Sequence, residues 1–357
     1  MVFLFKTAVW IVALLCLHRL LGIFWNRLFH VSGRYDQLHF AKTTDGWEIA
    51  MHRYTPEKQR EETKPVILCH GLGANRFNFD LGEGRSLACY LRDRGYDTWV
   101  VDLRGAGHSS RPQWFNRFGY GWTMDDHIDF DLPAAIDLVK RRTGAREVNW
   151  VGHSMGGIVM YAYLAGGGEG ISSVTAIASP GAFGADELKM PYGRIIGLFM
   201  WLPVFHFEFL ARGFTPIIAG LAPWIDRMTI NAENMDRDTI GRALANLVSD
   251  ISMGVMRQFI RGMKAGCFMS ADGSHRYQDH YRRITVPLFL GAGSMDGMVK
   301  AKAVRFVFDA VSSEDKRFKV FGREHGDLAD YGHGDLLVGN MAEQDVFPQI
   351  EAWLAAH

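Results

Sequence analysis

The run VNWVGHSMGG at residues 148–157 decides the fold of this chain, because a glycine-rich turn joins a strand pattern to a helix pattern. Its first half is apolar and β-branched, as in a buried strand, and a helical pattern follows from residue 158. The turn fits G-x-S-x-G, which needs small residues around a strained serine. The turn would lift the Ser154 hydroxyl out of the sheet, and the helix N-terminus would favour a developing negative charge. We predict that Ser154 is a nucleophile; a glycine-rich turn with an incidental serine is the alternative.

Further motifs connect this run to a known family. The strand, turn and helix resemble the nucleophile elbow of the α/β-hydrolase superfamily. Residues 102–109 fit D-x-R-G-x-G-x-S, which recurs there. Residues 123–157 resemble the acid-lipase branch, with its gastric and lysosomal lipases, and the polyester synthases and depolymerases. The synthases use cysteine at the elbow, so Ser154 favours hydrolysis. The resemblance runs from about Tyr35 to the end of the chain and implies an α/β-hydrolase fold.

The order of strand and helix patterns predicts the architecture. Alternating runs around Asp45-Gly46 predict a hairpin over residues 35–54. Buried-strand patterns follow at residues 65–69, 98–103, 148–152, 174–180, 284–291 and 316–321. The alternation breaks for about a hundred residues after residue 182. We therefore expect a mostly parallel sheet flanked by helices, formed by residues 31–182 and 285–357. Residues 183–284 are predicted to form an inserted helical cap that roofs an acyl pocket; a plain helical insertion is the alternative.

The resemblance implies an acid and a base for the serine. Asp296 follows the strand pattern at residues 284–291, where the superfamily places its acid, and Asp186 is the alternative. The sequence His-Gly-Asp-Leu occurs twice, beginning at His325 and at His333. We favour His333 as the base, because it leads into a C-terminal helix like that of the related chains. The order Ser154, Asp296, His333 is that of the superfamily.

The resemblance also implies an oxyanion hole. The buried strand at residues 65–69 ends in His70-Gly71-Leu72-Gly73. Carried onto this sequence, the backbone N–H of Leu72 would be one donor and that of Met155 the other. His70 lies too early in the chain to be the base, and we expect it to brace the loop.

The first 25 residues are strongly apolar. The uncharged core, residues 7–17, is short for a bilayer, but flanking charges that reach the interface extend it. We expect residues 1–30 to be an uncleaved membrane anchor or a membrane-surface helix, which places the protein at a membrane. A secretory signal peptide is a rival, although no small-x-small cleavage site is present. A helix packed on the domain is another alternative.

Composition limits the remaining possibilities. Lys plus Arg and Asp plus Glu both number 39, so nothing points to nucleic acid. The four cysteines show no C-x-x-C or metal spacing, which predicts free thiols. We predict no cofactor and no metal. A metal site formed by His325, His333 and nearby aspartates is a weak alternative, because the ligands lack fixed spacing.

These features predict a carboxylic-ester hydrolase that acts through an acyl-enzyme on Ser154. The apolar N-terminus and cap favour a lipid substrate, as for a lipase, phospholipase or long-chain esterase. An acyltransferase, a thioesterase and a polyester depolymerase would share every motif. A non-catalytic binding module on the same fold is the alternative of a different class.

Overall fold

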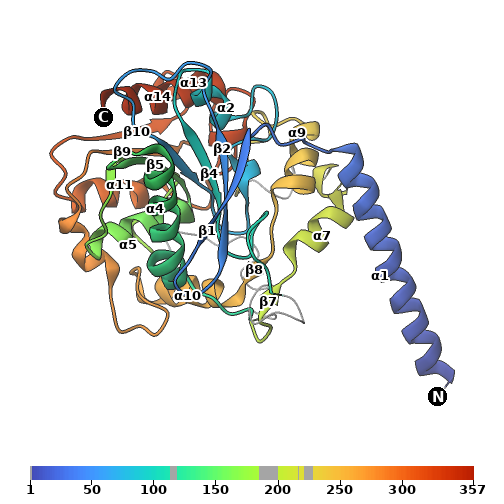
Figure 1. Cartoon of the computed structure of the whole chain (residues 1–357). Coiled ribbons are helices and arrows are strands. Elements are labelled where there is room, and N and C mark those ends of the chain that lie inside the picture. The colour runs from blue at the N-terminus through green and yellow to red at the C-terminus, as the bar shows by residue number, and fades with distance from the viewer. Residues whose placement is uncertain (1, 113–118, 185–199, 216, 221–227) are drawn as a thin grey trace.

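The computed structural model describes residues 2–112, 119–184, 200–215, 217–220 and 228–357, and it centres on one eight-stranded sheet (Figure 1). Strand β2 runs antiparallel to both of its neighbours, and the other pairs are parallel. The predicted mostly parallel sheet and hairpin are confirmed. In spatial order the strands are β1 Gln37–Lys42, β2 Glu48–Tyr54, β4 Thr98–Asp102, β3 Val66–Cys69, β5 Val148–His153, β6 Ile171–Ile177, β9 Leu288–Gly293 and β10 Lys316–Phe321.

Both faces of this sheet are buried, which explains why its central strands are continuously apolar. In β3, for example, Ile67 and Cys69 join one hydrophobic cluster while Val66 and Leu68 join the other. The first cluster lies under α4 Leu132–Thr143, α5 Met155–Ala165 and α11 Ala301–Ala310. The second lies under α2 Leu87–Arg92, α12 Asp335–Val338, α13 Ala342–Asp345 and α14 Phe347–Ala356.

The segment before β5 forms a helix in three pieces. They are α3 Met124–Asp126, a wider π-helical turn His127–Asp131, and α4. Within the π-helical turn, the His127 Nδ1 lies 2.7 Å from an Asp131 carboxylate oxygen, and Arg104 binds the same buried carboxylate. A helical pattern in the sequence does not distinguish this wider turn from an ordinary one.

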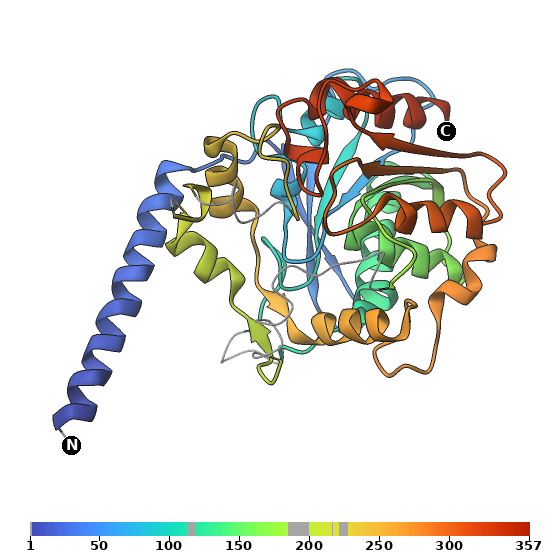
Figure 2. The ribbon, with the colours of Figure 1, turned by 180° about the vertical axis from the view of Figure 1, so that it is seen from behind.

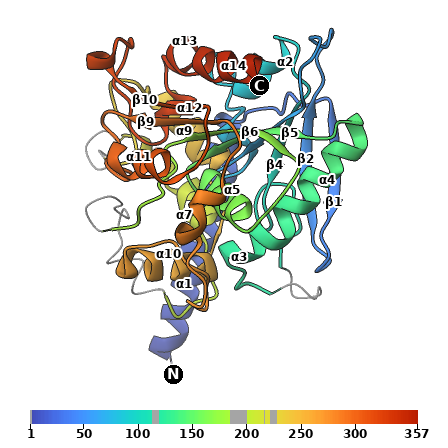
Figure 3. The ribbon, with the colours of Figure 1, turned by 90° about the vertical axis from the view of Figure 1, so that its left-hand side faces the viewer.

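The segment predicted as a helical cap contains helices and one feature that was not predicted. The helices are α7 Phe207–Gly213, α9 Arg237–Arg242 and α10 Met253–Ala265. A short antiparallel pair joins β7 Val204–Phe205 to β8 Ile251–Ser252, although these strands are far apart in the sequence. Figure 3 shows α10 and α1 at the end of the molecule opposite α13 and α14.

Helix α1, Val2–Leu28, projects from the body of the molecule (Figure 2). Its part Phe5–Leu28 is long and apolar enough to cross a membrane, by length and composition, and 6% of the tested window is buried. The C-terminal half lies against α7, where His18 Nε2 donates a 2.9 Å hydrogen bond to the Phe209 carbonyl oxygen. Farther along, Asn26 binds the Ala245 carbonyl oxygen at 2.9 Å. Helix α1 is therefore attached to the body by one end.

Candidate active site

Ser154 occupies a strained turn between β5 and α5. Its backbone has φ 51° and ψ −116°, a conformation that non-glycine residues rarely adopt. A Cβ added to Gly152 would lie 2.5 Å from the main chain of Gly156, and one added to Gly156 would overlap the Cys69 carbonyl group. A Cβ on Gly157 would overlap Ser179. The predicted need for small residues at all three positions is confirmed.

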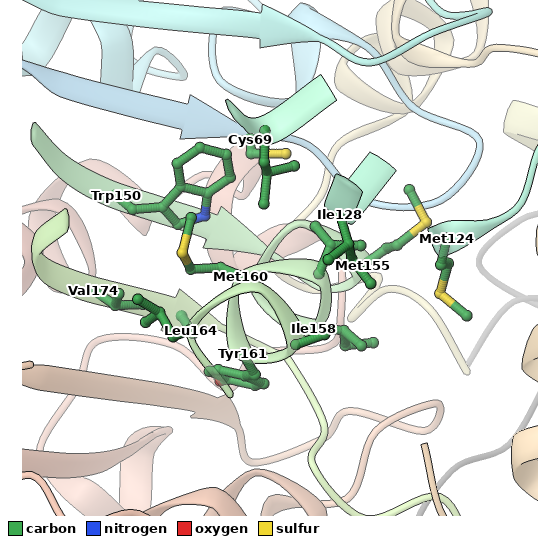
Figure 4. Close-up of a cluster of buried hydrophobic side chains, with 14 of the residues drawn as sticks. Cys69, Met124, Ile128, Trp150, Met155, Ile158, Met160, Tyr161, Leu164 and Val174 are labelled. Atoms are coloured by element: carbon green, nitrogen blue, oxygen red, sulfur yellow. The ribbon is translucent and has the colours of Figure 1, made fainter. Parts of the chain in front are cut away.

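Helix α5 gives this turn a rigid support. The amides of Gly157 and Ile158 donate to the Ser154 carbonyl oxygen at 3.1 and 3.2 Å and begin the helix. Figure 4 shows Met155, Ile158 and Tyr161 of α5 within the hydrophobic core. The Ser154 side chain itself is partly exposed. A partly exposed hydroxyl on a fixed helix N-terminus is well placed to react.

Asp296 and His333, in the loops that follow β9 and β10, form a buried pair. The Asp296 carboxylate lies 2.8 Å from His333 Nδ1, and the two residues are 2% and 7% exposed. The other Asp296 oxygen accepts from the amides of Met298 and Val299 at 2.9 and 2.8 Å. These bonds fix the carboxylate, which in turn keeps the His333 proton on Nδ1 and leaves Nε2 as the basic nitrogen.

The pair lies next to the serine turn. His153, the residue before Ser154, places its Nε2 3.1 Å from the His333 carbonyl oxygen, and the two imidazole rings lie 5.0 Å apart. The alternative base, His325, is exposed in the short 3₁₀ turn Arg323–His325. The structure thus brings Ser154, Asp296 and His333 into one region. The alternative acid, Asp186, lies outside the described residues.

The two predicted oxyanion donors line one narrow pocket. Leu72 and Met155 are both part of its wall, together with His70 and Ile251. Within the described residues, neither backbone amide donates to an acceptor. A Cβ on Gly71 would lie 3.1 Å from the Ser154 Cβ, so this loop passes close to the serine. Two unpaired amides beside a nucleophile suit a developing oxyanion.

His70 braces the loop that carries Leu72. Its Nδ1 donates to the Gly71 carbonyl oxygen at 2.8 Å, and its Nε2 accepts from the Leu103 amide at 3.1 Å. Burial lowers the pKa of this imidazole, so it is neutral at pH 7. Both nitrogens are used in binding the backbone, in agreement with the predicted bracing role.

One group of side chains in the described residues has the spacing of metal ligands, and it lies outside this site. His52 Nε2 is 3.0 Å from His108 Nδ1 and 3.7 Å from an Asp102 oxygen. His52 Nδ1 donates to the Val100 carbonyl oxygen, so its Nε2 accepts from His108. Burial lowers the pKa of His52 to about 4, which keeps it neutral. Hydrogen bonding accounts for these contacts. The four cysteines are free, as predicted.

Two buried side chains next to the predicted triad were missed from the sequence. One is His153. The other is Asp335, whose carboxylate accepts from the amides of Asn231 and Gly332 at 3.0 Å and from the Asn234 side chain at 3.1 Å. Asp335 therefore ties the His333 loop to residues 231–234. Both side chains bind segments far away in the sequence, so no local pattern marks them.

Asp335 should make the stability of the protein depend on pH. Burial raises the pKa of this carboxyl from 3.8 to about 6, so the folded protein keeps a proton that the unfolded chain releases. The resulting stabilisation is complete below about pH 4 and is lost as pH rises through about 6, roughly 3 kcal/mol in all. We expect the free energy of unfolding of wild type, minus that of Asp335→Asn, to fall by this amount between pH 4 and pH 7. Urea titrations measure it; a difference independent of pH would contradict the assignment.

Comparisons with known proteins find a matching family model, distantly similar sequences and similar solved structures. A family model described as alpha/beta hydrolase fold matches residues 64–202. Gastric triacylglycerol lipase of Bos taurus is 22% identical over 92% of this chain and 90% of that protein. A poly(3-hydroxyalkanoate) polymerase subunit of Haloarcula marismortui is 21% identical over 92% of this chain and 67% of that protein. Among solved structures, an esterase from Exiguobacterium antarcticum covers 89% of this chain and all of its own, with TM-score 0.59 and 19% identity.

Proposed function

Because the chain belongs to the α/β-hydrolase superfamily, we propose that it is a serine hydrolase that cleaves carboxylic esters through an acyl-enzyme on Ser154. The observation that carries the proposal is the buried Asp296–His333 pair beside the strained Ser154 turn. The Ser154 hydroxyl, the His333 imidazole and the Asp296 carboxylate then serve as nucleophile, base and orienting acid.

The proposed steps use side chains of this chain and water. His333 Nε2 takes the Ser154 proton as the oxygen attacks the ester carbonyl carbon. The Leu72 and Met155 amides donate to the resulting oxyanion, and Asp296 offsets the charge on the imidazolium. His333 then gives the proton to the departing alcohol oxygen as the C–O bond breaks. Water, deprotonated by His333, attacks the acyl-enzyme and releases the acid and Ser154.

Apolar side chains beside the oxyanion loop support a lipid substrate. Ile251, Met253 and Met256 form a buried cluster, against which Leu72 and Phe207 pack. Part of this cluster comes from the segment predicted as a cap, residues 183–284. An acyl chain leaving the Ser154 ester toward Leu72 would therefore meet hydrocarbon. We propose that this segment acts as the cap of the acyl site.

The shape of α1 supports attachment to a membrane. Residues 5–17 are exposed and precede His18, which binds the Phe209 carbonyl oxygen. Over these thirteen residues the helix rises about 20 Å at 1.5 Å per residue. A bilayer core is about 30 Å thick. If α1 spans the bilayer, the part of the helix that packs beside α7 must also enter the lipid, because residues 5–17 alone are too short. If α1 lies in the membrane interface, its exposed apolar side chains enter the lipid. We propose that α1 is retained in the mature protein; its removal as a signal sequence would contradict this.

Model esters of increasing acyl length test the lipid part. We expect kcat/KM for p-nitrophenyl esters to rise from acetyl to octanoyl and longer chains, because each buried methylene contributes about 0.8 kcal/mol of transfer free energy. Covalent labelling of Ser154 by a fluorophosphonate, located by mass spectrometry, tests the serine part separately. Activity restricted to acetyl esters would remove the lipid substrate but leave the hydrolase.

A further inference from the structure

His153 connects the serine strand directly to the loop of the base. It is the last residue of β5, it is 5% exposed, and its Nε2 lies 3.1 Å from the His333 carbonyl oxygen. Its Nδ1 lies 2.9 Å from the Asn78 side chain. The planes of the His153 and His333 rings meet at 44°. None of the proposed chemical steps uses this side chain.

The neighbouring polar groups of the His333 loop bind other partners, and the His333 carbonyl oxygen binds His153. The amide of Gly332 is held by Asp335, and the amide of Gly334 donates to the Thr229 carbonyl oxygen at 2.8 Å. Asp296 holds one edge of the His333 ring. The His333 carbonyl oxygen is the group that faces β5, and His153 is the side chain that binds it. The bond joins the residue before Ser154 to the base itself.

The protonation state of His153 agrees with a donor role. Burial, and to a lesser extent the neighbouring His333 imidazole, lowers its pKa to about 3. The neutral ring carries one N–H group, and a carbonyl oxygen can only accept, so that proton is on Nε2. Nδ1 faces Asn78 Oδ1, which also accepts from the Gly71 amide at 3.3 Å. Turning the Asn78 amide gives Nδ1 a donor, at the expense of that long Gly71 bond. With both nitrogens occupied, His153 is a poor candidate for the base.

We propose that His153 is a positioning residue: its Nε2–H group holds the His333 carbonyl and so fixes the base relative to Ser154. This inference rests on the proposed hydrolase function. A displacement of about 1 Å at a reacting group costs about 100-fold in rate. Loss of the bond should therefore slow the chemistry while leaving substrate binding nearly unchanged.

Three variants of the full chain separate the two bonds of His153. His153→Gln can place an N–H donor near the Nε2 position, His153→Asn keeps a polar group near the Nδ1 position, and His153→Leu keeps neither. We expect kcat to fall about 10- to 100-fold in the Asn and Leu variants with KM within about twofold, and to recover to within about fivefold of wild type in the Gln variant. The rate of fluorophosphonate labelling of Ser154 should follow the same order, because it also needs the base.

Two results would overturn the proposal. One is a Leu variant with the kcat of wild type. The other is a higher kcat in the Asn variant than in the Gln variant, since that order would assign the role to the Asn78 bond. Thermal unfolding of each variant identifies any that fails to fold. If the Leu variant fails to fold, the comparison of the Gln variant with the Asn variant decides the question. Failure of the hydrolase function would look different: wild type would neither hydrolyse esters nor be labelled at Ser154, or Ser154→Ala would keep full activity.

Discussion

Ser154→Ala lowers kcat for ester hydrolysis by about four to six orders of magnitude, which is among the largest effects expected of a single substitution in this chain. The hydroxyl is the atom that forms the acyl-enzyme, and the strained turn offers no second oxygen in its place. Because alanine is smaller than serine and accepts the same backbone, the variant should fold normally. Steady-state hydrolysis of an octanoyl ester, with circular dichroism as the check on folding, measures the effect.

Ser312→Ala is the matched control. Ser312 is exposed after α11, and its backbone amide donates to the Ile284 carbonyl oxygen. Loss of the same hydroxyl there should leave kcat and fluorophosphonate labelling unchanged. Equal activity in the Ser154 and Ser312 variants would show that the nucleophile is not Ser154.

The second large effect separates the two His-Gly-Asp-Leu repeats. His333→Ala should lower kcat by about four to six orders of magnitude, because it removes the base that Asp296 orients. His325→Ala should keep activity within about twofold, since that exposed side chain makes no contact with the pair within the described residues. The two variants remove the same group from nearly identical local sequence, so each controls for the other. Loss of activity in the His325 variant alone would reverse the assignment of the base.

Asp296→Asn completes this test. The amide can keep an acceptor for the amides of Met298 and Val299 but cannot offset the charge of an imidazolium. We expect kcat to fall about 10⁴-fold with the fold intact. Activity near that of wild type would point to another acid.

Much of the fold could be predicted because its signals are local. The strand of residues 316–321 and the hairpin around Asp45-Gly46 depend on short patterns, and the structure contains both. The Ser154 turn was equally readable, since the glycines that it requires lie within three residues of the serine. Asp296 and His333, by contrast, were assigned from the resemblance to the superfamily and its order of residues along the chain.

Contacts between distant segments could not be predicted in this way. His325 and His333 begin the same four residues, and it is burial and the bond to Asp296 that distinguish them. The bond from His153 to His333 spans 180 positions, and that from Asn231 to Asp335 spans 104. The pairing of β7 with β8 likewise lacks any hairpin turn. Such contacts follow from the folded arrangement of loops, for which a single sequence carries no periodic signal.

The close approach of Gly156 to the carbonyl groups of Cys69 and His70 has a wider meaning. It packs the serine turn directly onto the end of β3, so we expect the nucleophile and the Leu72 loop to move as one rigid unit. The positions of the nucleophile and the Leu72 loop are thus set before substrate binds. Any redesign of substrate entry therefore has to keep Gly156 and also residues 229–234, which hold the His333 loop.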